Sequence, residues 1–421
     1  MTIVALSSGR LPAAIAILRL SGPEAHAAAT SIAGALPSPR QASLRNLRHP
    51  HTAELIDRGL VLWFPGPKSA TGEDLVEFHC HGSRAVVEAM LEALTACPGV
   101  RLAEPGEFTR QSLRNGIMDL TEAEGLGDLL EAETEGQRKA ALSLLQGGLH
   151  DRLDALRERL INLSAMAEAG IDYVGDEDET SGHEAAIGTE LDAAREAVRR
   201  LLELPERRPL RDGIRVVLAG PPNVGKSSLL NALLGNERAL VSAEAGTTRD
   251  VVEAPVQIDG TAYILIDTAG LRDTDGAVEK MGIERAGGEI ERSDILLWLG
   301  APEDAPSHPC LIKVAAKTDI IESHGHYDIA VSAKTGDGIA ELIEHIRLKS
   351  NRLLPAADGL SLSRHHVAAL QEIEKQLVSE SDPVIFAEKL RAARHALDSL
   401  LGAHGLEDVL DRIFARFCLG K

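Results

Sequence analysis

Short apolar runs separated by glycine and proline characterise about the first 115 residues of the chain. Residues 15–20 and 59–64 are rich in aliphatic side chains and read as strands, and the sequence Pro-Gly-Pro at 65–67 ends the second of them. Residues 85–94 follow the period of a helix. The pattern predicts a mixed α+β segment.

From about residue 120 the apolar period becomes helical. Thr121 followed by Glu124 fits a helix-capping box. The acidic run 176–179 predicts a solvated loop rather than a metal site, and a further helix is expected over 184–204. An apolar seam with spacings of 4, 3, 4 and 3 residues is formed by Leu149, Leu153, Leu156, Leu160 and Leu163.

At residue 214 the pattern changes again. Four short apolar runs, at 214–219, 263–266, 295–299 and 311–315, alternate with helix-like segments. Such alternation predicts a parallel, doubly wound sheet with helices on both faces. After about residue 350 the chain is helical again. The sequence therefore predicts an α/β domain inserted into a helical domain, an arrangement that is tolerated where chain ends lie close together at a surface.

Composition and charge exclude some classes of protein. The 421 residues include only 11 aromatic side chains, and 44 basic against 64 acidic residues give a net charge of −20. This balance argues against a protein that coats nucleic acid with a uniformly basic surface, although a local basic site remains compatible with it. The apolar runs are far shorter than the ~18 residues that span a bilayer, and the first residues lack the pattern of a secretory signal. We expect a cytoplasmic protein without a membrane segment.

The cysteines, at positions 80, 97, 310 and 418, form no CxxC pair. Neither a disulfide framework nor a zinc module follows from them. The sequence His79-Cys80-His81 suggests a metal site, but alternate strand residues point to opposite faces, so structural or surface roles are favoured. Cys418 has the helical spacing of a core residue, which is favoured over a reactive thiol.

Residues 220–227, Gly-Pro-Pro-Asn-Val-Gly-Lys-Ser, match the phosphate-loop pattern GxxxxGK[ST]. The loop follows a predicted strand and precedes a predicted helix, which is the context the motif requires. Its backbone N–H groups would wrap phosphates at the helix N-terminus. Lys226 would reach the β- and γ-phosphates, and the Ser227 hydroxyl would bind Mg²⁺.

Four further motifs in order favour guanine over adenine. Asp267-Thr268-Ala269-Gly270 matches DxxG, Thr247 and Thr248 occupy the place of a switch threonine, Asp319 can accept both N–H groups of the guanine edge, and 332–334 read Ser-Ala-Lys. The GTP contacts predicted from these motifs are Asn223, Val224, Gly225, Lys226, Ser227, Ser228, Thr247, Thr248, Asp267, Thr268, Ala269, Gly270, Lys317, Asp319, Ser332, Ala333 and Lys334. Ser227 and Thr248 are the expected Mg²⁺ ligands.

Two positions depart from the usual pattern of guanine-binding GTPases. Ala316 stands where NKxD begins with asparagine, which removes one hydrogen bond worth ~0.5–1.5 kcal/mol and predicts weak nucleotide binding. Leu271 follows DxxG where Ras-type switches place a glutamine that orients water. Another group must therefore orient the water, and an arginine finger from Arg249 or Arg272 is one candidate.

The chain resembles the bacterial tRNA modification GTPases that act on the wobble uridine, the MnmE or TrmE family. The resemblance covers essentially the whole length. It rests on residues 17–22, 63–67, 71–74, 105–109, 220–228, 245–250 and 267–272, and most specifically on the ending Phe-Cys-Leu-Gly-Lys at 417–421.

The resemblance implies a multidomain α/β fold. Its parts are an N-terminal α+β folate-binding and dimerisation domain (1–117), a split all-helical domain (118–210 and 349–421) and an inserted P-loop, Ras-like G domain (211–348). It also implies a homodimer that joins a flavin-dependent protein in a heterotetramer and acts on tRNA. Together they add an aminomethyl or carboxymethylaminomethyl group at uridine C5, using 5,10-methylene- or 5-formyl-tetrahydrofolate.

Site residues follow from the same resemblance. Arg19, Glu77 and Lys421 would contact the folate, whereas Ile117 replaces a lysine usual in the family. K⁺ would be bound by Asn223 and by the loop Ser242, Ala243, Glu244, Ala245, Gly246 and Thr247, which also contacts GTP; the named potassium ligands are Asn223, Ser242, Glu244 and Thr247. Glu279 would orient the attacking water, and Lys226, Thr248 and Gly270 complete the catalytic set.

Two other functions compete with this hypothesis. One is a regulatory or ribosome-assembly GTPase with RNA-binding domains, but neither flank shows a basic helix or an aromatic-rich sheet. The other is a folate-binding transferase with a vestigial GTPase. Lys226, Ser227, Thr248 and Asp267 argue against it, while Ala316 argues for it.

Overall fold

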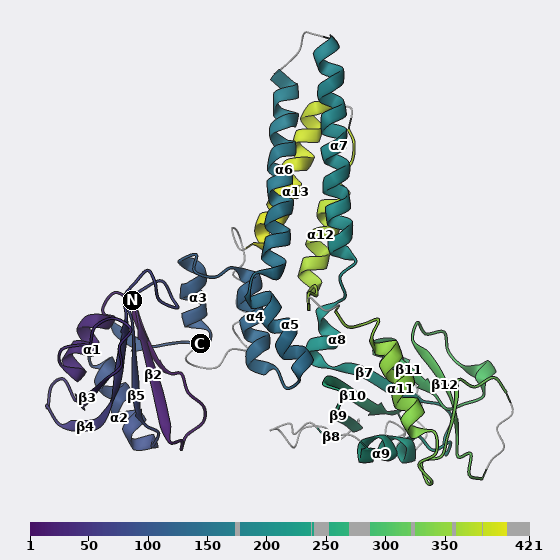
Figure 1. Ribbon diagram of the computed structural model, residues 1–421, viewed down its shortest axis with the longest axis horizontal. Helices are drawn as coiled ribbons and strands as arrows, with labels where there is room; N and C mark the ends of the chain where they lie inside the picture. Colours follow the sequence, from purple (N-terminus) through teal and green to yellow (C-terminus); the bar gives the residue numbers. More distant parts are fainter. Residues whose placement is uncertain are drawn as a thin grey trace, which may run out of the picture. The chain divides into compact units, whose positions relative to one another are not determined.

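A computed structural model describes residues 1–172, 177–236, 238–239, 252–268, 287–320, 325–355, 359–380 and 382–401. The chain divides into two compact units. One comprises Met1–Gly127 and the described residues from Leu397 onward, and the other comprises Asp128–Ala396 (Figure 1). No helix among the described residues is long and apolar enough to cross a membrane.

The first unit contains a six-stranded sheet of order β3-β4-β5-β2-β1-β6, antiparallel except for the β1–β6 pair. The strands are β1 Thr2–Leu6, β2 Ile15–Ser21, β3 Ser43–Arg48, β4 Leu55–Phe64, β5 Leu75–His81 and β6 Val100–Leu102. The helices are α1 Ala25–Ala33, α2 Arg84–Thr95, α3 Glu107–Arg114 and α4 Leu120–Glu131, and α4 continues into the second unit from Asp128 onward. The mixed α+β character predicted for this segment is confirmed.

Alternation along the strands separates the two faces of this sheet. Val4, Leu18 and Leu20 are buried in one apolar cluster with residues of α1 and α2. Ile3 and Ala5 belong to a second cluster, which includes Phe108 of α3. Arg19 lies between Leu18 and Leu20 and therefore faces the side of α3.

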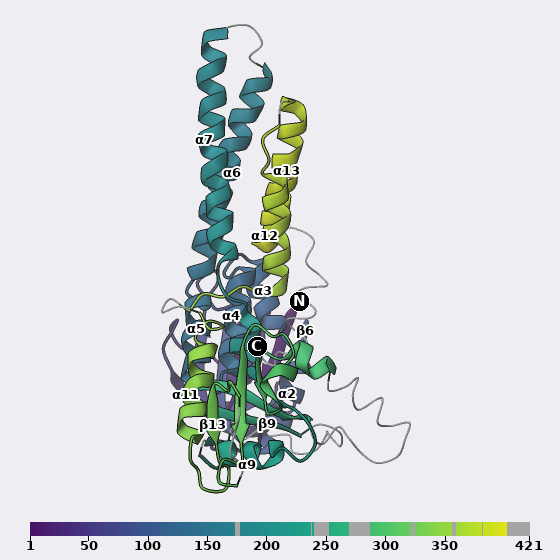
Figure 2. The ribbon, with the colours of Figure 1, turned by 90° about the vertical axis from the view of Figure 1, so that its right-hand side faces the viewer.

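Long helices form the helical part of the second unit: α5 Glu135–Leu145, α6 Gly148–Asp172, α7 Glu177–Leu202, α12 Arg364–Gln376 and α13 Pro383–Leu400. The five seam leucines of α6 are all buried, with at most 1% exposure. α7 packs against both α6 and α12 (Figure 2). The Nε of Arg195 in α7 also donates to the Leu377 carbonyl, 2.6 Å away, just after α12.

Two local predictions for the helical region were wrong. The capping box of α4 is formed by Asp119 and Glu122, not by Thr121 and Glu124. Asp119 Oδ1 accepts from Glu122 N at 3.0 Å, and Glu122 Oε2 accepts from Asp119 N at 2.9 Å. An aspartate is an equally good cap, so two registers competed in the sequence. Residues 177–179 belong to α7 rather than to a loop, because acidic residues are favourable in the first turn of a helix.

The G domain has a seven-stranded sheet of order β13-β12-β11-β7-β10-β9-β8. Its strands are β7 Ile214–Ala219, β8 Arg238–Ala239, β9 Val252–Ile258, β10 Thr261–Asp267, β11 Ile295–Trp298, β12 Leu311–Ala316 and β13 Ile329–Val331. The helical elements are α8 Arg207–Asp212, α9 Lys226–Asn236, α11 Ile339–Ser350 and the 3-10 turn Pro302–Asp304, and residues 287–292 are also helical.

Five of these strands pair in parallel, and the sequence predicted four of them but not β13. In addition, β9 and β8 form an antiparallel edge. The sequence did not predict β9 because Pro255 interrupts it, and proline is tolerated only at strand edges and bulges. β9 turns into β10 through Asp259 and Gly260, both of which have positive φ (47° and 80°). This geometry is typical of tight two-residue hairpins.

The junction, defined here as residues 205–212 and 359–363, is where the chain enters and leaves the G domain. Glu206 and Leu362 form a parallel β-bridge. Arg207 N donates to the Leu362 carbonyl at 2.8 Å, and Leu362 N donates to the Pro205 carbonyl at 2.9 Å. The two chain segments thus run side by side at the entrance of the inserted domain.

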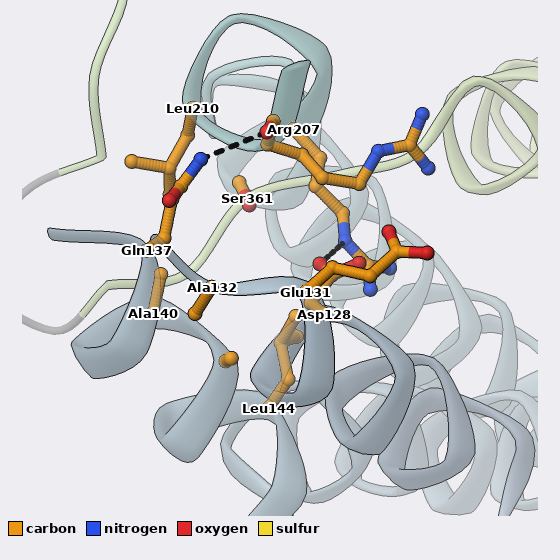
Figure 3. Close-up of a pocket in the computed structure, with 11 residues that line it drawn as sticks. Asp128, Glu131, Ala132, Gln137, Ala140, Leu144, Arg207, Leu210 and Ser361 are labelled. Carbon is orange, nitrogen blue, oxygen red and sulfur yellow. Dashed lines mark hydrogen bonds and ion pairs between the residues drawn. The ribbon is translucent and has the colours of Figure 1, made fainter. Parts of the chain in front are cut away.

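Side chains of α4 and α5 pack beneath the junction around a small cavity of about 20 Å³ (Figure 3). Arg207 Nε pairs with Asp128 Oδ2 at 2.5 Å, and Gln137 Nε2 donates to the Arg211 carbonyl at 2.9 Å. The Ser361 hydroxyl lines this cavity and is buried without a hydrogen-bond partner in the described part of the chain. A cavity of this size holds one water molecule, which would satisfy that hydroxyl.

Candidate functional site

The phosphate loop connects β7 to α9, as its motif predicts. Gly220 and Gly225 have φ values of 146° and 106°, a region that glycine adopts without steric cost. A Cβ on Gly220 would lie 3.1 Å from the Leu299 carbonyl carbon. The backbone conformation of the loop, which curls at the N-terminus of α9, therefore requires glycine at both positions. Phosphates are favoured at such a position by backbone N–H groups and by the helix dipole.

Lys226, the first residue of α9, is 6% exposed. Its Nζ donates to the carbonyls of Gly220 at 3.0 Å and Pro221 at 2.8 Å. The ammonium therefore lies inside the curl of the loop, where it can meet the charge of bound phosphates.

Ser227 and Asp267 bring oxygen atoms together beside Lys226. The Ser227 hydroxyl donates to Asp267 Oδ2 at 2.5 Å. Asp267 ends β10 and is 3% exposed, because β10 pairs in parallel with β7 and both strands end at the same edge. A hydroxyl and a carboxylate are hard oxygen ligands of the kind Mg²⁺ prefers. The donor set present fits a magnesium ion.

The segment 316–319 approaches the phosphate loop. Lys317 has a positive φ of 61°, and its Nζ donates to the Asn223 carbonyl at 2.6 Å. Asp319 is exposed, and one of its oxygens accepts from the fully buried Ser332 hydroxyl at 2.9 Å. This bond fixes the carboxylate that the sequence assigns to the guanine edge. Ala316 packs against the apolar core of the domain and offers no polar side-chain atom.

The remaining described residues of the predicted nucleotide site lie around these groups. Val224 packs on the core, and Thr268 is buried with its hydroxyl donating to the Leu218 carbonyl at 2.8 Å. Ser228 and Lys334 are exposed, and Ala333 is half-buried. The Asn223 side chain is exposed and has no hydrogen-bond partner among the described residues. The structure thus brings the phosphate-binding and base-binding motifs to one edge of the sheet.

Several predicted positions lie outside the described residues. They are Ser242, Ala243, Glu244, Ala245, Gly246, Thr247, Thr248, Arg249, Ala269, Gly270, Leu271, Arg272, Glu279, Cys418 and Lys421.

In the first unit, Arg19 of β2 and Glu77 of β5 lie directly opposite each other in the sheet. Both the Nε and Nη2 of Arg19 donate to Glu77 Oε1, at 3.2 and 2.9 Å. The side chains are 25% and 16% exposed. The Arg19 guanidinium also lies 5.9 Å from the centre of the Phe108 ring. Arg19 and Glu77 thus form a half-buried, oriented pair rather than two solvated surface charges.

The second carboxylate oxygen of Glu77 faces His79 Nε2 at 3.4 Å. Ile117 is 43% exposed. At the start of α3, burial would raise the pKa of Glu107, but the Arg101 side chain and the Glu104 N–H hold it below its ordinary value. Phe108 and the Arg101–Glu107 pair were not anticipated, because no short motif marks contacts between a helix and a strand edge.

His79, Cys80 and His81 alternate between the two faces of β5, as the sequence predicts. Cys80 is 3% exposed on the face opposite to the histidines, and burial raises the pKa of its thiol to about 12. His81 Nδ1 and N contact the two oxygens of Asp57 at 2.8 Å each. Burial alone would raise the pKa of Asp57, but the bonds from His81 and the Arg58 N–H lower it overall.

The fold and the site together define a multidomain P-loop GTPase whose G domain is inserted into a helical domain. A family model described as the MnmE helical domain matches residues 120–418, and one described as the GTP-binding protein TrmE N-terminus matches residues 2–117. The chain belongs to the MnmE family of tRNA modification GTPases.

Relatives that match the chain over its full length support the same family assignment. The chain is 48% identical over 427 residues to the tRNA modification GTPase MnmE of Rhizorhabdus wittichii, covering 100% of this chain and 96% of the relative. It is 44% identical over 437 residues to that of Novosphingobium aromaticivorans, covering 100% and 99%. With the MnmE of Erythrobacter litoralis it shares 45% identity over 424 residues, covering 100% of both chains.

The predicted role of Asp319 as the reader of guanine leads to a substitution test. Asp319→Asn should weaken GDP binding by about 10- to 100-fold, because hydrogen bonds to a charged acceptor contribute ~1.5–3 kcal/mol. It should strengthen binding of xanthosine diphosphate, whose exchanged edge suits an amide. Calorimetric titration with both nucleotides measures this. The exposed Asp304→Asn is the matched control, and an unchanged guanine preference in Asp319→Asn would show that another group reads the base.

Proposed function

We propose that the protein hydrolyses GTP and, with a flavin-dependent partner, adds an aminomethyl or carboxymethylaminomethyl group at C5 of the wobble uridine in certain tRNAs. It would act as a homodimer within a heterotetramer and take the one-carbon unit from 5,10-methylene- or 5-formyl-tetrahydrofolate. The observation that carries the proposal is full-length membership of the MnmE family combined with an intact set of Lys226, Ser227 and Asp267.

In this proposal Lys226 neutralises the β- and γ-phosphates, and Ser227 with Thr248 holds Mg²⁺. The Ser227–Asp267 hydrogen bond supports the assignment, because it already gathers hard oxygen atoms beside the lysine. Gly270 would sense the γ-phosphate through its N–H. Glu279 would orient the water, since Leu271 has no group that hydrogen-bonds.

K⁺ is proposed to be held by Asn223 together with Ser242, Glu244 and Thr247. The exposed Asn223 amide supports this, because its oxygen has no partner among the described residues. The Asn223 backbone carbonyl is fixed by Lys317, which keeps the side chain at the mouth of the loop. A bound ion would supply positive charge to the phosphates, the electrostatic contribution that an arginine finger makes elsewhere.

The folate is proposed to bind at Arg19 and Glu77, with Lys421 as a further contact. Glu77 Oε1 is occupied by Arg19, whereas Oε2 has, among the described residues, only the longer contact with His79. A pterin edge that donates two hydrogen bonds would therefore share Oε1 with Arg19 and take Oε2 itself. Ile117 offers no charge for the folate tail, so the cations that meet its carboxylates must come from other positions.

The first test is chemical analysis of tRNA. Cells that lack the protein should lose the C5 modification of the wobble uridine, and the wild-type gene should restore it. A Lys226→Ala gene should fail to restore it, because the phosphates lose their buried cation. Liquid chromatography with mass spectrometry of digested tRNA measures the nucleoside. Unchanged tRNA in the deletion strain would instead favour a regulatory or ribosome-assembly GTPase.

The potassium site leads to a second prediction. GTP hydrolysis should be faster in KCl than in NaCl at equal ionic strength, and Asn223→Ala should remove the difference. Glu279→Ala should slow hydrolysis by about 10²-fold or more in either salt, as the loss of a general base does. Asn231→Ala, an exposed position on α9, is the control for Asn223. Equal rates in both salts, with Arg249→Ala inactive, would establish an arginine finger instead.

The folate site leads to a third prediction. Arg19→Ala in the full chain should weaken binding of 5-formyltetrahydrofolate by about tenfold or more, because a charge-assisted contact is lost. Arg19→Lys should retain more of the affinity, since it keeps the charge. Arg48→Ala, an exposed arginine of the same sheet, should change nothing. If fluorescence titration finds no binding even to the wild-type chain, the folate assignment fails.

A further inference from the structure

Four arginines gather at a cavity of about 310 Å³ in the second unit. Arg207, Arg208 and Arg211 come from α8, and Arg364 is the first residue of α12. The lining also contains the carboxylates of Glu206 and Asp212. The cavity opens beside the junction, and its volume lies at the lower end of the ~300–1,000 Å³ typical of ligand pockets.

Neighbouring carboxylates hold three of these arginines in place. Arg207 is 5% exposed and pairs with Asp128 at 2.5 Å. Arg208 is bound by both oxygens of Asp294, and Arg211 donates from Nε and Nη2 to Asp212 at 2.7 and 3.2 Å. A guanidinium has five N–H donors. The bonds of Arg208 and Arg211 named here each use two, which leaves further donors on side chains whose position is already fixed.

Arg364 differs from the other three. It is exposed and has no ion-pair or hydrogen-bond partner among the described residues. It also stands at the N-terminus of a 13-residue helix, where backbone N–H groups and the helix dipole favour an anion. Carboxylates pair with Arg207, Arg208 and Arg211, so the positive charge without a partner among the described residues comes from Arg364 and from the positive end of α12.

This local positive charge at Arg364 and the end of α12 contrasts with the whole chain, whose net charge is −20. An acidic protein that acts on RNA is repelled by it overall, so its contacts must be concentrated at local basic positions. Arginine is suited to such contacts, because its planar fork matches phosphate oxygens. We infer that this cavity binds a backbone phosphate of the tRNA substrate. The inference rests on the proposed function.

Direct binding of tRNA to the full-length protein tests the site. Arg364→Ala and Arg211→Ala should each weaken binding by about five- to tenfold. Each should also reduce the slope of log affinity against log salt by about 0.7–0.9, the value expected for one lost phosphate contact. Fluorescence anisotropy of a labelled transcript between 50 and 300 mM KCl provides both quantities. Arg391→Ala, 69% exposed on α13, is the control.

The variants should keep the GTP hydrolysis rate and thermal midpoint of the wild type, which shows that they are folded. Affinity and slope equal to those of the control would overturn the inference and leave the proposed function intact. A wild-type chain that binds no tRNA would overturn both. Inorganic phosphate is the second probe. If the variants lose phosphate binding but bind tRNA like the wild type, the cavity is a free-anion site and the RNA assignment is wrong.

Discussion

The two backbone hydrogen bonds between residues 205–207 and Leu362 are the constraint on which the second unit depends. An inserted domain needs its first and last residues close together, and the β-bridge at Glu206 and Leu362 provides this closure. Without this bridge, the two segments that connect the G domain to the helical domain would not be bonded to each other. With it, α8 is positioned over α4 and α5, where Arg207 meets Asp128 and Gln137 meets the Arg211 carbonyl (Figure 3). The backbone contact of Gly136 N with the Gly260 carbonyl, at 3.3 Å, further ties α5 to the β9–β10 hairpin.

The sequence predicts the elements of the fold well, because their signals are local. The seam leucines of α6, the strand before the phosphate loop and the strand that ends in Asp267 are each marked by period or motif. Features that depend on distant residues could not be predicted in the same way. The antiparallel strand β9 was not predicted because of Pro255, and the capping box of α4 had two competing registers.

The same distinction applies to the candidate site. The motifs predict that Lys226, Ser227 and Asp267 belong to one site. The contact between Ser227 and Asp267 then follows from the parallel pairing of β7 and β10. The contact of Lys317 with the Asn223 carbonyl depends on the positive φ of Lys317, which cannot be predicted from the residue type. Likewise, the ring of Phe108 near Arg19 depends on where α3 packs. The sequence thus predicted which residues belong to the candidate site, whereas their contacts with one another could be found only from the tertiary structure.

Asp294 joins the junction to the segment that follows the DxxG motif. It binds the guanidinium of Arg208 in α8 and also accepts from Arg215 N at 2.9 Å at the start of β7. Arg215 in turn contacts Glu289, in the helical residues 287–292, at 2.7 Å. A displacement of residues 287–294 must therefore carry α8 with it or break these pairs. Because Asp294 is 7% exposed, leaving it unpaired costs about 1–3 kcal/mol. The Arg208–Asp294 pair therefore opposes any separation of α8 from the start of β7.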